Sequence, residues 1–146
     1  MNILVLNGPN LNLLGLREPS IYGNQTYEDL VDYLHSLEKV YNVRLDIKQS
    51  NHEGTIIDYL HKANESYHGI LLNAGAFTHY SYALFDAIKA ITPPVIEVHL
   101  TDIEHRSESW RKISVIKDAC KGQISGLGFQ SYEEGLKLLL KEGTKK

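Results

Sequence analysis

Residues 69–100, GILLNAGAFTHYSYALFDAIKAITPPVIEVHL, carry two apolar runs with one helical pattern between them. Gly69–Asn73 and Val95–Leu100 have the length and continuous apolar character of buried strands, and a helix is expected from about Ser81 to Ile91. The two prolines that follow stop this helix. A strand, a helix and a second strand in this order predict a right-handed unit with parallel strands.

The same alternation continues on both sides of this unit. Further strands are expected at Asn2–Leu6, Val43–Gln49 and Gln123–Gly128, and further helices after the capping box Thr26–Asp29, after SNHEG (residues 50–54) and from Ser131. Five strands alternating with helices predict one α/β domain over residues 1–146, a flavodoxin-like doubly wound five-stranded parallel sheet with helices on both faces. Residues 16–25 are expected to form a lid loop, and the tail 143–146 is expected to be frayed.

The composition is typical of a soluble globular protein. The 146 residues are 42% hydrophobic and 23% charged, with a formal net charge of −3 and scattered basic residues. This charge distribution excludes an extended basic surface for nucleic acid, and no apolar run is long enough to span a membrane. No signal peptide precedes the first expected strand, and the single cysteine, Cys120, excludes an internal disulfide, so a cytoplasmic protein is expected.

Polar residues gather where the expected strands end. In doubly wound sheets, ligands bind at the carboxyl ends of the strands, which selects residues 7–25, 50–54, 73–81 and those from 99 onward. These segments contain four of the seven histidines: His52, His79, His99 and His105. Asn and Gly in turns explain part of this polarity without any ligand. The convergence of these segments on one edge of the sheet nevertheless favours a binding site.

Glu97 and His99 interrupt an otherwise apolar strand. Residues two positions apart in a strand project from the same face, so the two side chains are neighbours. A buried carboxylate is costly unless it is paired, and a hydrogen bond from His99 would satisfy it. The same bond would fix the imidazole tautomer and favour its protonated form, which suits a general acid. A self-satisfied core pair without a catalytic role remains the alternative.

Arg17 and Tyr22 lie together in the expected lid loop. A free tyrosine has a pKa of about 10, but a nearby guanidinium favours tyrosinate and lowers that pKa. The two side chains could therefore form a base that assembles when the loop closes. A solvated arginine and a tyrosine that packs on a neighbour are the alternative, and on the residues alone this alternative is the favoured interpretation.

Several cofactor motifs are absent from the sequence. There is no phosphate-binding P-loop, and Gly126-x-Gly128 lacks the third glycine of a dinucleotide fingerprint. No cysteine and histidine spacing is typical of a zinc site. We therefore expect no cofactor and no metal, and acid–base chemistry on a polar small molecule. A flavodoxin-like binding or regulatory domain without catalysis is the alternative from another class, and an enzyme of this fold that acts on a nucleotide or flavin is a third.

Four segments, LNGPNLNLLGLREPSIYG, SNHEG, LNAGAFTHYS and EVHLTD, together resemble the type II 3-dehydroquinate dehydratases. The resemblance is collinear from Asn2 to the last expected helix, and the family is flavodoxin-like. It implies a hydro-lyase of the shikimate pathway of aromatic amino acid biosynthesis. Such an enzyme converts 3-dehydroquinate to 3-dehydroshikimate by cofactor-free anti elimination of water through an enolate.

The resemblance also assigns catalytic roles. Tyr22 would remove the proton alpha to the substrate carbonyl, and Arg17 would lower the pKa of that tyrosine. Asn10 would hold a water that stabilises the enolate oxygen. His99, oriented by Glu97, would protonate the leaving hydroxyl.

The remaining implied roles concern substrate binding and assembly. Asn73, His79 and an arginine, Arg111 or else Arg106, would bind the ring hydroxyls, and the backbone amides of Leu100 and Thr101 would hold the substrate carboxylate. Asp86 would reach a neighbouring site in a homo-oligomer, a dodecamer built from trimers. The sequence departs from the family pattern at Phe85 and Asp102, where arginine and asparagine are usual.

Overall fold

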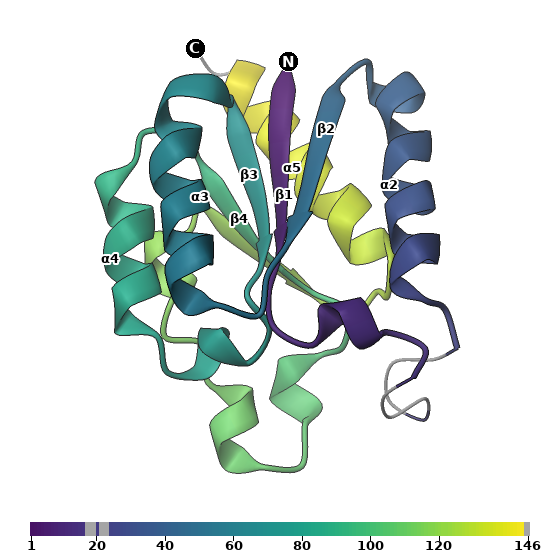
Figure 1. Cartoon of the computed structure of the whole chain (residues 1–146), viewed down its shortest axis with the longest axis vertical. Coiled ribbons are helices and arrows are strands. Elements are labelled where there is room, and N and C mark those ends of the chain that lie inside the picture. The colour runs from purple at the N-terminus through teal and green to yellow at the C-terminus, as the bar shows by residue number, and fades with distance from the viewer. Residues whose placement is uncertain (17–19, 21–23, 145–146) are drawn as a thin grey trace.

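Five parallel strands form the central sheet of the structure, a computed structural model that describes residues 1–16, 20 and 24–144. They are β1 (Asn2–Asn7), β2 (Arg44–Gln49), β3 (Gly69–Asn73), β4 (Val95–His99) and β5 (Gly122–Ser125). Their spatial order is β2-β1-β3-β4-β5 (Figure 1). This is the order of a flavodoxin-like sheet, so the predicted fold class is confirmed.

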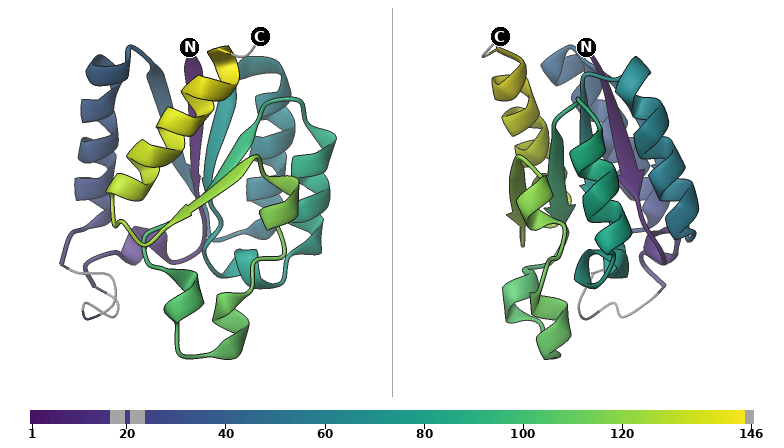
Figure 2. Two further views of the ribbon diagram at one scale, coloured as in Figure 1. Left: turned by 180° about the vertical axis from the view of Figure 1, so that it is seen from behind. Right: turned by 90° about the vertical axis from the view of Figure 1, so that its left-hand side faces the viewer.

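Four helices cover the two faces of this sheet. α2 (Tyr27–Tyr41) and α5 (Gln130–Thr144) pack on one face, and α3 (Glu53–Ser66) and α4 (Tyr82–Ala90) pack on the other (Figure 2). Two separate cores result, because alternate strand residues point to opposite faces. The side chains of Asn7 and Asn73 follow the α2/α5 face, whereas those of Glu97 and His99 follow the α3/α4 face.

The ends of two helices test the sequence reasoning. The predicted capping box is confirmed, because Thr26 Oγ1 accepts a hydrogen bond from the Asp29 amide at 3.1 Å and Asp29 Oδ2 accepts one from the Thr26 amide at 2.9 Å. The predicted cap at Ser131 is wrong, since α5 already begins at Gln130. Ser131 Oγ instead accepts a hydrogen bond from the Leu127 amide at 3.0 Å. α5 continues to Thr144, two residues into the tail that was expected to be frayed.

The fifth strand is shorter than predicted. β5 ends at Ser125 instead of Gly128. Gly126 has φ +86° and Gly128 has φ +60°, a left-handed backbone conformation that a strand does not adopt. The chain therefore turns directly after Ser125 and enters α5.

Short 3₁₀ helices line the carboxyl edge of the sheet. They are η1 (Leu11–Leu13), η2 (Gly75–His79), η3 (Ile103–His105) and η4 (Ser109–Lys112), and η5 (Lys117–Ala119) precedes β5. The loops after β1 and β3 touch, because a Cβ on Gly8 would lie 2.5 Å from the carbonyl oxygen of Ala74. Only glycine permits this approach, which brings the residues after β1 beside those after β3. Within the described part of the chain, no helix combines the length and apolar character needed to cross a membrane.

Candidate active site

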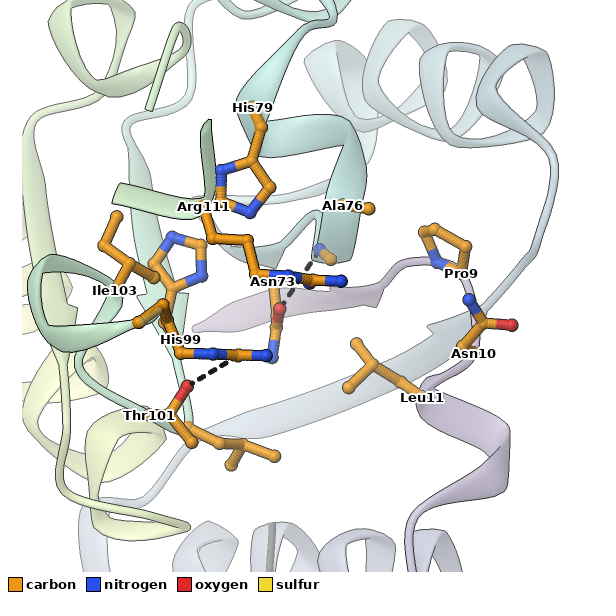
Figure 3. Close-up of a pocket in the computed structure, with 13 residues that line it drawn as sticks. Pro9, Asn10, Leu11, Asn73, Ala76, His79, His99, Thr101, Ile103 and Arg111 are labelled. Carbon is orange, nitrogen blue, oxygen red and sulfur yellow. Dashed lines mark hydrogen bonds between the residues drawn. The ribbon is translucent and has the colours of Figure 1, made fainter. Parts of the chain in front are cut away.

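A cavity opens at the carboxyl ends of β1, β3 and β4, beside the point where the strand order reverses. Its empty volume is about 530 Å³, including space open to solvent. Eight residues singled out from the sequence line it: Asn10, Asn73, His79, His99, Leu100, Thr101, Arg106 and Arg111. Figure 3 shows the side chains of His79, His99, Asn73 and Arg111 converging on the cavity, with Asn10 on the opposite wall.

His99 and Glu97 form a buried pair at the base of this cavity. His99 Nε2 is hydrogen-bonded to Glu97 Oε2, and the exposed fraction is 6% for His99 and 0% for Glu97. Glu97 lies behind the imidazole and does not itself line the cavity. The carboxylate engages Nε2, so Nδ1 is the ring nitrogen that remains for a substrate. This arrangement suits transfer of a proton from His99.

His79 is held as a hydrogen-bond acceptor. Its Nδ1 donates to the carbonyl oxygen of Ile113 at 2.7 Å, which leaves the Nε2 lone pair for a ligand. Burial lowers the pKa of His79, and the positive charges of His99, Arg111 and Arg106 lower it further, against the backbone hydrogen bond that raises it. A neutral imidazole at pH 7 follows, ready to accept a hydrogen bond from a hydroxyl.

Trp110 supports the arginine next to it. The Arg111 guanidinium carbon lies 4.2 Å from the centre of the Trp110 ring, and Arg111 Nε lies 3.1 Å from Glu108 Oε2. The same ring meets His79 edge-on, with ring centres 5.3 Å apart. Trp110 therefore fixes two cavity residues that come from different elements. The second arginine, Arg106, donates from Nη1 to Thr101 Oγ1 at 3.4 Å.

The amide of Asn73 is oriented by two partners. Asn73 Oδ1 accepts a hydrogen bond from the Gly75 amide at 3.2 Å, and Asn73 Nδ2 donates to the Tyr132 hydroxyl at 3.0 Å. The same hydroxyl donates to Asn7 Oδ1 at 2.6 Å, and burial raises the pKa of Tyr132, so the phenol stays protonated. Sequence reasoning missed Tyr132, for which the only signal was the high number of tyrosines, nine in the chain.

The turn that carries Asn10 is held from β2. Asn10 has φ 69°, and its amide donates to Asn51 Oδ1 at 3.0 Å. Gln49 Nε2 donates to the same Asn51 oxygen at 3.0 Å and to the Gly8 carbonyl at 3.1 Å. Asn51 belongs to the SNHEG segment that the sequence placed at this edge, but its role as a support of the turn was not predicted.

Leu100 and Thr101 directly follow β4 and lie at the cavity wall; the family resemblance implies that their amides hold the substrate carboxylate. The next residue, Asp102, is directed into η3. Its Oδ1 accepts from the Glu104 amide at 3.0 Å and its Oδ2 lies 2.7 Å from His105 Nδ1. This carboxylate is thus engaged locally.

Other predicted residues lie away from this cavity. Asp86 is exposed on α4 and does not line it, and the preceding Phe85 packs partly buried against the core under α3 and α4. Arg17 and Tyr22 lie outside the described residues. Across residues 1–16, 20 and 24–144, no three His, Cys, Asp or Glu side chains are grouped as a metal ion would require.

Comparisons with known proteins give a consistent picture. The family described as Dehydroquinase class II has a model that matches residues 1–140. The 3-dehydroquinate dehydratase of Bacillus pumilus is 50% identical over 142 residues, which cover 97% of this chain and 96% of the relative. That of Halalkalibacterium halodurans is 53% identical over 144 residues, covering 99% and 98%. The crystal structure of type II dehydroquinase from Butyrivibrio crossotus matches with a TM-score of 0.93 and 46% identity, covering 95% of this chain and 97% of the other.

Proposed function

We propose how this cavity works from one premise: the chain belongs to the class II dehydroquinase family and is a 3-dehydroquinate dehydratase, a hydro-lyase of the shikimate pathway. Its product is then 3-dehydroshikimate. The feature that carries the proposal is the buried Glu97–His99 pair, which sits at the base of a cavity with several hydrogen-bonding side chains.

The first step is removal of a proton alpha to the substrate carbonyl. Tyr22, as tyrosinate, takes this proton, and the electrons of the broken C–H bond form an enolate. Arg17 favours the tyrosinate and stabilises the developing negative charge. Asn10, on the cavity wall, holds the water that donates a hydrogen bond to the enolate oxygen. The roles of Tyr22 and Arg17 rest on the family resemblance of their sequence segment.

The second step is expulsion of the hydroxyl. The enolate electrons restore the carbonyl and form the ring double bond while the C–O bond breaks. Protonated His99 gives its proton to the departing oxygen, which leaves as water. Glu97 stabilises the imidazolium before this transfer and keeps the ring in place. The base and the acid are separate groups, which suits an anti elimination.

Substrate binding uses the remaining cavity residues. Asn73, His79 and Arg111 contact the ring hydroxyls, and Arg106 supports the same region beside Thr101. The neutral His79 offers Nε2 as an acceptor. The substrate carboxylate lies on the backbone amides of Leu100 and Thr101, which bind an anion without a full positive charge.

The reaction needs only these acid and base groups, so we propose that it proceeds without metal or organic cofactor. We place the enzyme in the cytoplasm in the same proposal. The test is to add 3-dehydroquinate to the purified chain without metal or nucleotide and to follow the ultraviolet absorbance of the conjugated enone. Absorbance should rise, and a chelator should leave the rate unchanged. A rate abolished by the chelator would contradict the proposal.

Two substitutions test the assigned acid and base. Tyr22→Phe should lose nearly all turnover while substrate still binds, because only the phenolic oxygen is removed. His99→Ala should lower kcat by roughly 10²–10⁴-fold. His105→Ala is the matched control, because the His105 side chain is 82% exposed and outside the cavity lining. Wild-type turnover in Tyr22→Phe would place the base elsewhere.

We further propose a dodecamer of trimers in which Asp86 reaches the active site of a neighbouring subunit. Asp86 lies on the exposed side of α4, and Tyr82 on the same helix is 71% exposed. Exposed aromatic surface of this kind is typical of interfaces. Light scattering should give a mass twelve times that of the 16.5 kDa chain. A monomer with full activity would refute this assembly.

A further inference from the structure

The carboxylate of Glu97 has a second partner, from a segment distant from β4. Glu97 is 0% exposed, and Ser114 Oγ lies 2.9 Å from its Oε1 and 2.8 Å from its Oε2. The serine is the donor, because an ionised carboxylate only accepts hydrogen bonds. A buried carboxylate requires several donors to remain charged, so His99 and Ser114 together satisfy Glu97.

The segment around Ser114 is attached to the site at three successive residues. The Ile113 carbonyl accepts the hydrogen bond from His79 Nδ1 at 2.7 Å, and the Val115 amide donates to the Thr78 carbonyl at 2.8 Å. Ser114 lies between these two bonds. The same segment directly follows η4, which carries Arg111. One stretch of chain therefore connects the proposed acid to a hydroxyl-binding histidine and to an arginine of the cavity.

We infer, on the basis of the proposed function, that Ser114 is a positioning residue for the general acid. Its hydroxyl holds the Glu97 carboxylate in place and stabilises its negative charge, and Glu97 in turn holds protonated His99 towards the substrate. The bond also fixes η4 relative to β4, so the acid and Arg111 keep a constant separation. Ser114 itself contacts no substrate, since it does not line the cavity.

Two side chains near Glu97, those of Gln123 and Cys120, do not take the place of this hydroxyl in the structure. Gln123 is the direct neighbour of Glu97 across β4 and β5, yet its buried Nε2 has no hydrogen-bond partner among the described residues. Burial and the negative charge of Glu97 raise the pKa of the Cys120 thiol, so this group stays protonated at neutral pH. His79 and Arg111 lie beside His99 and come from η2 and η4, as the close-up shows (Figure 3). In the structure as it stands, Ser114 is thus the donor that completes the carboxylate.

The test compares Ser114→Ala with Ser114→Thr, which keeps a hydroxyl, and with Ser109→Ala, a matched control that removes an exposed serine from η4. In Ser114→Ala, kcat should fall about tenfold, less than the roughly 10²–10⁴-fold general-acid share. KM should change less than kcat. Without the Ser114 hydroxyl, the negative charge of Glu97 is less stabilised, so the Glu97–His99 pair keeps its shared proton to higher pH. The alkaline limb of the kcat–pH profile should therefore move to higher pH.

Ser114→Thr should recover most of kcat and the wild-type pH profile, and Ser109→Ala should match the wild type. A role confined to folding would lower the melting temperature and leave the pH profile in place. Wild-type kcat and pH profile in Ser114→Ala would therefore overturn the inference, and so would an equal loss in Ser114→Thr. Absence of dehydratase turnover in the wild type would instead refute the proposed function.

Discussion

Tyr132→Phe should destabilise the protein and weaken substrate binding together. Tyr132 is 0% exposed on α5, and its hydroxyl lies between Asn7 and Asn73. The direction of each hydrogen bond follows from the backbone. The Gly75 amide requires the oxygen of Asn73, so the nitrogen of Asn73 faces Tyr132, which then donates its single proton to Asn7 Oδ1.

The magnitude follows from the two groups that would lose their partner. Phenylalanine fits the same space, so the substitution creates no steric conflict, but it leaves Asn73 Nδ2 and Asn7 Oδ1 unpaired. Each unpaired buried group costs about 1–3 kcal/mol, so the free energy of unfolding should fall by about 3 kcal/mol. For a chain of this size, that corresponds to a melting temperature lower by about 6–12 °C. The freed Asn73 amide should also raise KM by about 3–10-fold, or roughly 1 kcal/mol.

Thermal unfolding and steady-state kinetics measure these two effects. Tyr67→Phe is the matched control, because it removes a hydroxyl that donates to Asp46 Oδ2 at 2.6 Å before β3, away from the cavity. Burial, with the hydrogen bond to Asp46, raises the pKa of Tyr67 to about 12, so this phenol also stays protonated in the assay. The control should lower stability without changing KM. A Tyr132→Phe protein with the melting temperature and KM of the wild type would refute the reasoning.

Three further predictions concern other parts of the chain. Because burial and nearby positive charge lower the pKa of His79, its imidazole NMR signals should titrate below the usual pH of about 6.5, and a higher midpoint would contradict this. The hydrogen bond from Tyr41 lowers the pKa of Glu133 in the folded protein. The stability that ionised Glu133 contributes is therefore present above its unfolded pKa of about 4.3 and is lost as the pH falls through its folded pKa. Urea unfolding of Glu133→Gln should therefore show a smaller loss of stability between neutral and acidic pH than the wild type. Gly8→Ala should lower the free energy of unfolding by about 2 kcal/mol or more and lower kcat, because the added Cβ would lie 2.5 Å from a backbone oxygen of the loop after β3. Calorimetry should show that the control Gly54→Ala, whose added Cβ has nothing within 4 Å, is neutral or stabilising.

The sequence predicted the sheet well because its strands are continuous apolar runs. Such runs must be buried, and their alternation with helices favours a parallel sheet that is covered on both faces. The errors lie between β5 and α5. There, Gly126 and Gly128 adopt positive φ, and Ser131 bonds to a loop amide instead of capping the helix. Apolar pattern alone does not distinguish a glycine in a strand from a glycine that ends one.

The cavity was predictable where its chemistry is local. Glu97 and His99 are two residues apart on one strand, so their pairing follows from strand geometry. The residues that support the cavity were missed because their partners are far along the chain. Tyr132 is 125 residues from Asn7 and Asn51 is 41 residues from Asn10, and no local pattern indicates such contacts. They become visible only when the fold brings the carboxyl ends of the strands together.

The two faces of the sheet support different parts of the proposed reaction. Asn73, a proposed binding residue, is fixed from the α2/α5 face by Tyr132, and His99, the proposed acid, is fixed from the α3/α4 face by Glu97 and Ser114. His99 keeps Nδ1 for the substrate, and Asn73, whose Oδ1 and Nδ2 each have one internal partner, keeps a second lone pair and a second N–H. Alternation along a strand makes this division possible, because successive residues can be supported by separate cores while their loops meet at one edge. Tyr132 and Glu97 are both 0% exposed, so this support is rigid. The doubly wound sheet thus orients the proposed acid and the proposed hydroxyl-binding groups before substrate arrives, which is the condition for efficient proton transfer.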